Sequence, residues 1–147
     1  GYHSGALRGD VYPYVPVALR RCRQAGVAPA IFSSGSELAQ RRLFGSTIHG
    51  DLIPFIAGFF DTTVGPKLAS SSYVEVARRL GVPASAMLFV SDVTMELDAA
   101  ASAGCVALLS IRPGNRPQPN PDRYPAIRTF AEILPGCASD YALLRSC

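Results

Sequence analysis

The sequence lacks any apolar run near the roughly 20 residues that a membrane-spanning helix needs. Its opening Gly-Tyr-His-Ser also lacks the charged and apolar regions of a signal peptide. We therefore expect no membrane partner and a cytoplasmic location.

The sequence also lacks a large excess of charge of one sign. Charged residues make up 17% of the chain, with a formal net charge of +3, and basic pairs such as Arg41-Arg42 and Arg78-Arg79 are scattered. A nucleic-acid surface gathers its basic residues on one face, so the sequence predicts no nucleic-acid partner.

The cysteines also lack the close spacing of metal-binding or redox motifs. Cys22, Cys105, Cys137 and Cys147 show no CxxC spacing. In a cytoplasmic protein this distribution favours reduced structural thiols over zinc ligands or disulfides.

Lysine is almost absent, because Lys67 is the single lysine among fourteen Lys and Arg residues. A lysine ammonium is a compact point charge, whereas guanidinium is a planar fork. Either position 67 requires that point charge, or the isolated lysine reflects chance.

What the chain does contain is typical of one globular domain. It has 147 residues, 48% of them hydrophobic, enough to bury roughly two thirds of its unfolded surface. Apolar runs predict strands at 27–32, 56–60, 87–90 and 105–111, and helical spacing predicts helices at 19–25, 37–44, 72–80, 93–103 and 126–134. This alternation predicts an α/β fold with a parallel sheet and flanking helices.

The helix at 72–80 is expected to begin with a capping box. Ser72 and Glu75 have the spacing at which a serine hydroxyl and a carboxylate satisfy the first free amides of a helix.

The stretch around Asp92 is the most informative. A short apolar run ends abruptly in Ser91 and Asp92, and Glu96 follows one helical turn later. Ligands of open α/β sheets bind outside the carboxyl ends of the strands, where Asp92 is expected. The alternative is that Asp92 caps the following helix.

Two further strand ends carry polar residues. Ser33 and Ser34 follow the strand at 27–32 and precede a helix, so their hydroxyls and amides suit an anion, although Ser34 or Ser36 could instead cap that helix. Lys67 follows the strand at 56–60. Parallel strands bring these ends to one rim, where hydroxyls, a cation and a carboxylate suit a phosphate and a divalent metal.

Seven segments carry a family likeness: 9–13 (GDVYP), 31–44 (IFSSGSELAQRRLF), 50–52 (GDL), 60–67 (FDTTVGPK), 70–77 (SSSYVEVA), 88–100 (LFVSDVTMELDAA) and 112–115 (RPGN). Together they resemble the haloacid-dehalogenase-like (HAD-like) hydrolases, and within them the enolase-phosphatases, or acireductone synthases. The resemblance implies a HAD-like Rossmannoid core.

The resemblance also implies a role for each site residue. Ser33 and Ser34 would bind the substrate phosphate, and Lys67 would steady the negative charge of an aspartyl nucleophile and of the transferring phosphoryl group. Asp92 would ligate Mg²⁺, with Glu96 as its supporting acid.

The implied activity is a step of methionine salvage. An enolase-phosphatase converts 2,3-diketo-5-methylthiopentyl 1-phosphate to an acireductone and phosphate, so the expected partner is a small phosphorylated molecule and the complete enzyme is expected to be a monomer. Two alternatives stay open: a HAD-like phosphatase with another substrate, or a catalytically dead remnant.

The sequence departs from the family in one respect. Family members open with a strand ending in Asp-x-Glu-Gly-Thr, which supplies the nucleophile, followed by a helical cap; neither is recognisable here, and Asp10, Asp51 and Asp61 align elsewhere. We expect an N-terminally incomplete HAD-like fragment or truncated product, with a return from the cap at 1–13, the core at 14–134 and a tail at 135–147.

Two consequences are expected from that departure. The chain alone should not catalyse turnover, because no phosphoaspartate can form. The missing strand is the central one, so the strands ending at Ser33 and Asp92 would have unpaired edges unless they pair directly, and the chain alone should be unstable.

Overall fold

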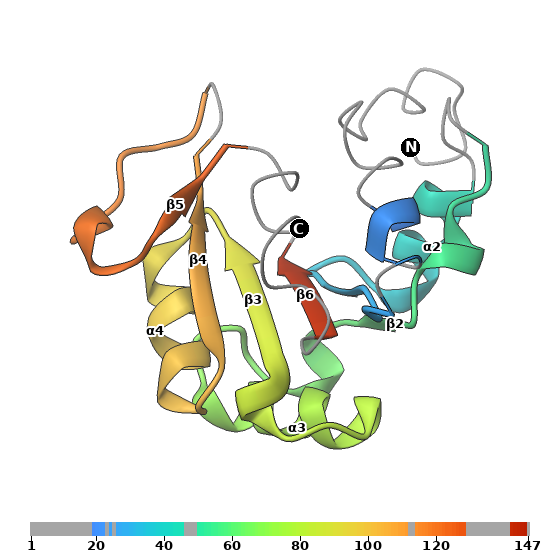
Figure 1. Cartoon of the computed structure of the whole chain (residues 1–147), viewed down its shortest axis with the longest axis horizontal. Helices are drawn as coiled ribbons and strands as arrows, with labels where there is room; N and C mark the ends of the chain where they lie inside the picture. Colours follow the sequence, from blue (N-terminus) through green and yellow to red (C-terminus); the bar gives the residue numbers. More distant parts are fainter. Residues whose placement is uncertain are drawn as a thin grey trace.

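A single sheet of parallel strands organises the part of the chain that the computed structural model describes: residues 19–22, 24, 26–45, 50–111 and 114–128, and the backbone of 142–146. The strand order is β2-β1-β6-β3-β4-β5 (Figure 1). The strands are β1 (Ala30–Phe32), β2 (Gly58–Phe60), β3 (Met87–Ser91), β4 (Val106–Ser110), β5 (Ala126–Ile127) and β6 (Ala142–Ser146). Neighbouring strands pair in parallel throughout, which confirms the expected α/β class.

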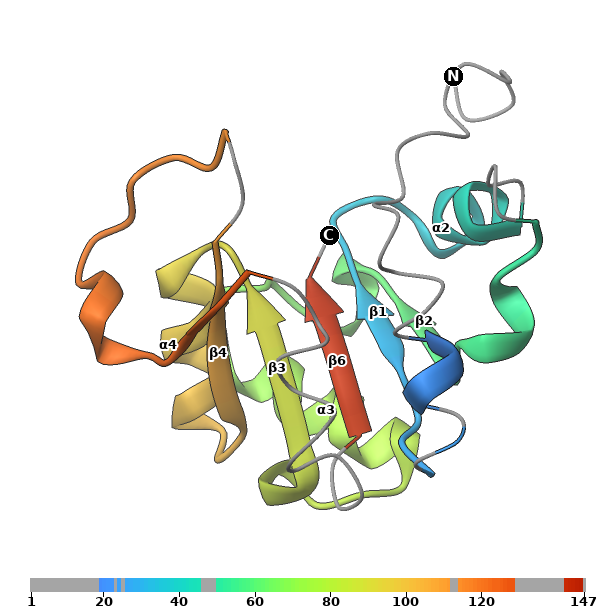
Figure 2. The same ribbon diagram turned by 45° about the horizontal axis from the view of Figure 1, so that its top comes forward.

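Helices flank both faces of this sheet. The α-helices are α2 (Glu37–Gly45), α3 (Ser70–Leu80) and α4 (Thr94–Ser102), and residues 19–22 and 24 are also helical. Figure 2 shows α3 and α4 behind the sheet and the helical turn near residue 20 in front of it. Short 3-10 turns occur at Ile53–Phe55, Thr62–Val64, Ala84–Ala86 and Pro121–Arg123.

Each face of the sheet has its own hydrophobic core. In β3, Phe89 packs on the α3 and α4 side with Phe32 and Tyr73, whereas Val90 packs with Leu19 and Ile31 on the opposite side. All five residues of β3 are buried. Successive side chains of a strand point to opposite faces of the sheet. Because both faces of β3 are covered, the strand needs a continuous apolar run.

The centre of the sheet is occupied by β6, the last described element in the chain. It pairs in parallel with β1, where Phe32 is opposite Ser146, and with β3, where Leu88 is opposite Leu143. This is the place that the family resemblance assigns to the absent strand. The expectation of unpaired β1 and β3 edges is therefore wrong, because backbone from the segment expected as a tail covers both.

Two predictions of local structure are wrong. Residues 126 and 127 begin no helix: they form β5 and pair with Leu109 and Ser110 of β4, and positions 129–134 lie outside the described residues. The apolar spacing there fitted a helix, but an available sheet edge decided the conformation.

The capping box at Ser72 is also absent. Helix α3 begins two residues earlier, at Ser70, and its N-cap Ala69 has no side-chain cap bond. The Ser72 hydroxyl instead donates to the carbonyl oxygen of Pro66, 2.6 Å away, and Glu75 pairs with Arg78 and Arg79.

Cys22 and Cys105 are free and buried, which confirms the structural thiols expected at these two positions. Burial raises the pKa of each thiol to about 11. Cys137 and Cys147 lie outside the described residues. Among the helices that the structure describes, none is long and apolar enough to span a bilayer.

Candidate active site

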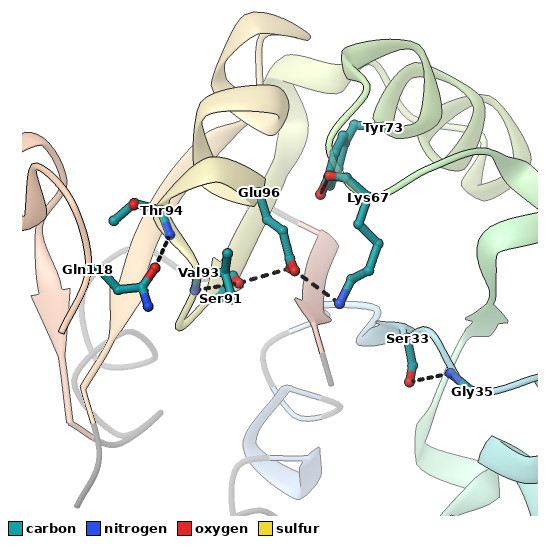
Figure 3. Close-up of polar contacts among 9 residues, drawn as sticks. All are labelled: Ser33, Gly35, Lys67, Tyr73, Ser91, Val93, Thr94, Glu96 and Gln118. Atoms are coloured by element: carbon teal, nitrogen blue, oxygen red, sulfur yellow. Dashed lines mark hydrogen bonds and ion pairs between the residues drawn. The ribbon is translucent and has the colours of Figure 1, made fainter. Parts of the chain in front are cut away.

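Three strand ends deliver the expected polar residues to one rim of the sheet. Ser33 directly follows β1, Asp92 directly follows β3, and Lys67 follows β2 after the short turn at Thr62–Val64. Because the strands are parallel, their carboxyl ends share this rim. Figure 3 shows the Lys67 side chain reaching between Glu96 and the turn that carries Ser33.

Lys67 is held by a buried carboxylate. Its Nζ atom lies 3.2 Å from Oε1 of Glu96, and the two side chains are only 10% and 11% exposed. The hydroxyl of Ser91 donates to the same Oε1 at 3.0 Å and accepts from the backbone N–H of Val93 at 3.0 Å. Nζ also lies 5.9 Å from the ring centroid of Phe32, the last residue of β1. The cation is thus placed between the ends of β1 and β3.

The turn before Lys67 is anchored to α3. The hydroxyl of Tyr73 donates to the carbonyl oxygen of Lys67 at 2.6 Å, beside the bond from Ser72 to Pro66. Burial, followed by the negative charge of Glu96, raises the pKa of Tyr73, so this hydroxyl stays a donor. Gly65 has φ +134°, and a Cβ there would lie 2.3 Å from the Ser72 hydroxyl oxygen, so only glycine fits.

The turn with Ser33 and Ser34 has a similar support. The Ser33 hydroxyl oxygen accepts from the N–H of Gly35 at 3.2 Å, and the Ser33 N–H donates to the carbonyl of Phe60 at 3.0 Å. Nε2 of Gln40 donates to the carbonyls of Gly35 (2.9 Å) and Phe60 (2.8 Å). These bonds fix the turn against the end of β2.

Of the two serines considered as caps of α2, Ser36 makes the cap bond. The Ser36 hydroxyl oxygen accepts from the N–H of Ala39 at 3.1 Å, and an oxygen of Asp61 accepts from the N–H of Glu37 at 2.9 Å. The Thr63 hydroxyl, followed by the Thr63 and Glu37 amides, lowers the pKa of Asp61. Ser33 is buried and Ser34 is exposed, and the cap of α2 is made without either.

Asp92 makes no cap bond to α4. The N-cap residue is Val93, which has no side-chain cap bond, and the Thr94 N–H donates instead to Oε1 of Gln118 at 3.1 Å. The capping function considered for Asp92 therefore belongs to a residue of the loop after β4. Asp92 is half-buried and lines a cavity beside that loop.

The acids expected around a magnesium ion are only partly grouped. Among the described residues, no three His, Cys, Asp or Glu side chains come together as a metal-binding group. The Glu96 carboxylate contacts Lys67 and Ser91. Asp92, directly after β3, is therefore the carboxylate better placed to bind a metal ion at the rim. Mg²⁺ prefers six oxygen ligands, so these described residues do not by themselves form a complete site.

Three supporting residues were not singled out as functional by sequence reasoning. Ser91 orients Glu96, Tyr73 anchors the Lys67 turn and Gln118 caps α4. A hydroxyl directly before Asp92 could have indicated Ser91. Gln118 has no local signal, because its partner is 24 residues away.

The arrangement suits a negatively charged oxygen compound. The hydroxyls of Ser33 and Ser34 can donate hydrogen bonds, and the Lys67 ammonium supplies a fixed positive charge close to the same rim. These are groups that stabilise charge on a transferring phosphoryl group.

Comparison with known proteins agrees with this chemistry. The sequence profile of the haloacid dehalogenase-like hydrolases matches residues 2–104. The yeast UTR4 protein (Saccharomyces cerevisiae) superposes with a TM-score of 0.64 at 32% identity, over 80% of this chain and 63% of that one. A HAD phosphatase from Thermococcus onnurineus gives 0.70 at 26% identity, over 84% and 56%. The chain belongs to the haloacid dehalogenase-like hydrolases.

Within that family the chain is similar to enolase-phosphatases. It is 44% identical to enolase-phosphatase E1 of Pseudomonas aeruginosa (strain UCBPP-PA14), over 91% of this chain and 58% of that protein. It is 48% identical to a probable bifunctional methylthioribulose-1-phosphate dehydratase/enolase-phosphatase E1 of Populus trichocarpa, over 90% of this chain. The chain spans 26% of that plant protein and a little over half of the bacterial one.

Proposed function

We propose that the chain carries the phosphate-binding part of an enolase-phosphatase site of methionine salvage. Its substrate would be 2,3-diketo-5-methylthiopentyl 1-phosphate, and its products an acireductone and phosphate. The observation that carries the proposal is the buried Lys67–Glu96 pair, which fixes an ammonium at the rim near Ser33. Similarity to enolase-phosphatases supports the choice of substrate.

Each residue has a distinct task in this proposal. Ser33 and Ser34 donate hydrogen bonds to phosphate oxygens, and Lys67 offsets the negative charge that grows on the transferring phosphoryl group. Glu96 holds the Lys67 ammonium in place, and Ser91 holds Glu96 in the required orientation. Because the Lys67 side chain is only 10% exposed, water screens its ammonium less than it would screen a surface lysine.

Magnesium dependence is part of the proposal. Asp92 would supply one oxygen ligand, and water would supply most of the others. When bound, the ion would neutralise phosphate charge. The small phosphorylated substrate, the monomeric complete enzyme and the cytoplasmic location belong to the same proposal.

We further propose that these 147 residues alone bind phosphate without turnover, since none of their aspartates matches the family's nucleophile. The test compares phosphate release from the diketo phosphate and from a generic phosphomonoester by two proteins. One is the chain itself, and the other is the chain extended with the nucleophile strand and cap of the Pseudomonas relative. The added strand would have to pair where β6 now lies.

The extended protein should show Mg²⁺-dependent release that favours the diketo phosphate. Replacing Lys67 by Ala in it should lower kcat by about 10²-fold or more, the usual cost of removing a charge-stabilising group. Replacing Arg79, an exposed cation on α3, by Ala is the matched control and should have little effect. Retained turnover in K67A, or Mg²⁺-dependent release by the 147 residues alone, would contradict the respective part of the proposal.

A further inference from the structure

A cavity of about 290 Å³ lies beside Asp92, at the carboxyl end of β4. β4 neighbours β3 on the side opposite to β6 and β1, so the cavity and the Ser33 turn flank Asp92 from different sides. Figure 3 shows the same order, with Gln118 at one end of the group and Ser33 at the other. The volume is at the small end of the range of ligand pockets, roughly 300–1,000 Å³, and suits a short chain.

The wall of this cavity is largely apolar. Leu109, Ile111, Pro117 and Pro121 line it from the end of β4 and the loop that follows. Apolar walls stabilise a ligand by removing its hydrocarbon surface from water.

The loop that closes the cavity is tied down at two points. Nδ2 of Asn115 donates to the carbonyl of Ser110 at 3.0 Å, and Gln118 accepts from Thr94 at 3.1 Å. Both amide side chains also line the cavity. A wall that is fixed before a ligand arrives saves the entropy of ordering it.

Charges of both signs border the cavity. Asp92 lies on the β3 side, and the exposed Arg116 comes from the loop. In the proposed function Asp92 would ligate Mg²⁺, so the charge left at the loop side is that of Arg116, which disfavours a cationic group. The largely apolar wall disfavours a charged group of either sign, so the group that fits is uncharged.

We propose that this cavity is the subsite for the short, uncharged and mainly apolar tail of a phosphate monoester whose phosphate binds at Ser33, Ser34 and Lys67. The inference rests on the proposed function, since it needs the phosphate at that position. The loop at 114–121 selects this part of the substrate.

The test measures binding of inorganic phosphate and of methyl, propyl and pentyl phosphate to the full 147-residue chain, in the presence of Mg²⁺, by NMR titration of ¹⁵N-labelled protein. Affinity should rise about three- to fourfold for each added methylene that becomes buried. Pentyl phosphate, but not methyl phosphate, should shift the Ile111 amide and the side-chain NH₂ signals of Asn115 and Gln118.

Variants of the loop separate the cavity from the phosphate site. Replacing Pro117 by Asp places a charge in the wall and should remove the gain with chain length, while leaving inorganic phosphate binding unchanged. Replacing Pro119 by Asp adds the same charge to the same loop outside the cavity lining, and should keep the gain. Pro121 also lines the cavity, and its replacement by Asp is the second variant, used if the first does not fold.

The outcomes distinguish this inference from the proposed function. If inorganic phosphate binds, and K67M weakens it, but affinity does not depend on chain length, the tail subsite is wrong and the phosphate site stands. An equal gain with chain length in P117D, P121D and P119D would also overturn the subsite. If neither phosphate nor any alkyl phosphate binds, both are wrong.

Discussion

The ammonium of Lys67 lies 3.2 Å from Oε1 of Glu96, in surroundings where the two side chains are only 10% and 11% exposed. Buried pairs differ from surface pairs because each charge has given up most of its hydration. The pair also joins elements that are distant in sequence, since Lys67 follows β2 and Glu96 belongs to α4. It therefore fixes the position of the cation more firmly than either element could alone.

Removing one member of this pair should cost much more stability than removing a surface pair. Glu96→Gln keeps the shape but removes the carboxylate charge 3.2 Å from the buried Lys67 ammonium, which should lower the free energy of unfolding by about 3 kcal/mol. Combining it with Lys67→Met removes both charges and should recover part of that loss. Urea unfolding measures each variant.

The control for this comparison is an exposed pair in the same protein. Arg41 and Glu37 are 3.0 Å apart on α2, with side chains 46% and 53% exposed. Glu37→Gln should change the free energy of unfolding by about 0.5 kcal/mol or less. Equal losses for Glu37→Gln and Glu96→Gln would show that the Lys67 pair has no special role.

Gly65→Ala should disturb the Lys67 turn directly. The residue has φ +134°, and the added Cβ would lie 2.3 Å from the Ser72 hydroxyl oxygen. We expect a loss of about 2–3 kcal/mol, more than the roughly 1 kcal/mol expected where a glycine has positive φ but open space around it. Gly81→Ala is that control, with φ +74° and no atom within 4 Å. Adding Ser72→Ala to Gly65→Ala should recover some stability, and no recovery would argue against the clash.

The local elements around the site could be predicted from the sequence because their signals are local. The continuous apolar run before Asp92 predicted a strand buried on both faces, and the helical spacing after it predicted α4. The serines after β1 and the turn before Lys67 were likewise readable from short motifs. These predictions depend on side-chain periodicity over a few residues, which the sequence states directly.

The parts that failed depend on pairing across long sequence separations. Five residues at 142–146 carry weak strand signals, and their place between β1 and β3 is decided by two strand edges more than 50 residues away. The apolar spacing at 126–134 predicted a helix, but Ala126 and Ile127 pair with the edge of β4 instead. Gln118 could not be identified as a cap from local rules, since the helix that it caps begins 24 residues earlier.

Replacing Gln118 tests that remote cap. Gln118→Ala removes the acceptor for the Thr94 N–H and should lower the free energy of unfolding by about 1 kcal/mol, a typical value for a lost cap. Gln118→Glu keeps an acceptor and places negative charge at the start of α4, where it is favourable, so stability should be kept. Hydrogen exchange at the Thr94 amide should accelerate only in the Ala variant. Unchanged exchange there would show that the cap bond contributes little.

The buried thiols predict a loss of stability at alkaline pH. Burial raises the pKa of Cys22 and of Cys105 from 9.0 to about 11, so the folded state holds protons that the unfolded state has already released. Their contribution is complete below pH 9 and is lost as the pH rises to about 11. The double variant Cys22→Ala, Cys105→Ala should therefore have a flatter stability curve between pH 9 and pH 11, although its stability at pH 7 is lower because two small cavities form. Urea midpoints across this range measure the slope.

A double variant whose stability falls as steeply with pH as that of the wild type would assign the alkaline loss to other groups. Burial also raises the pKa of Tyr73, so Tyr73→Phe would be the next variant to measure.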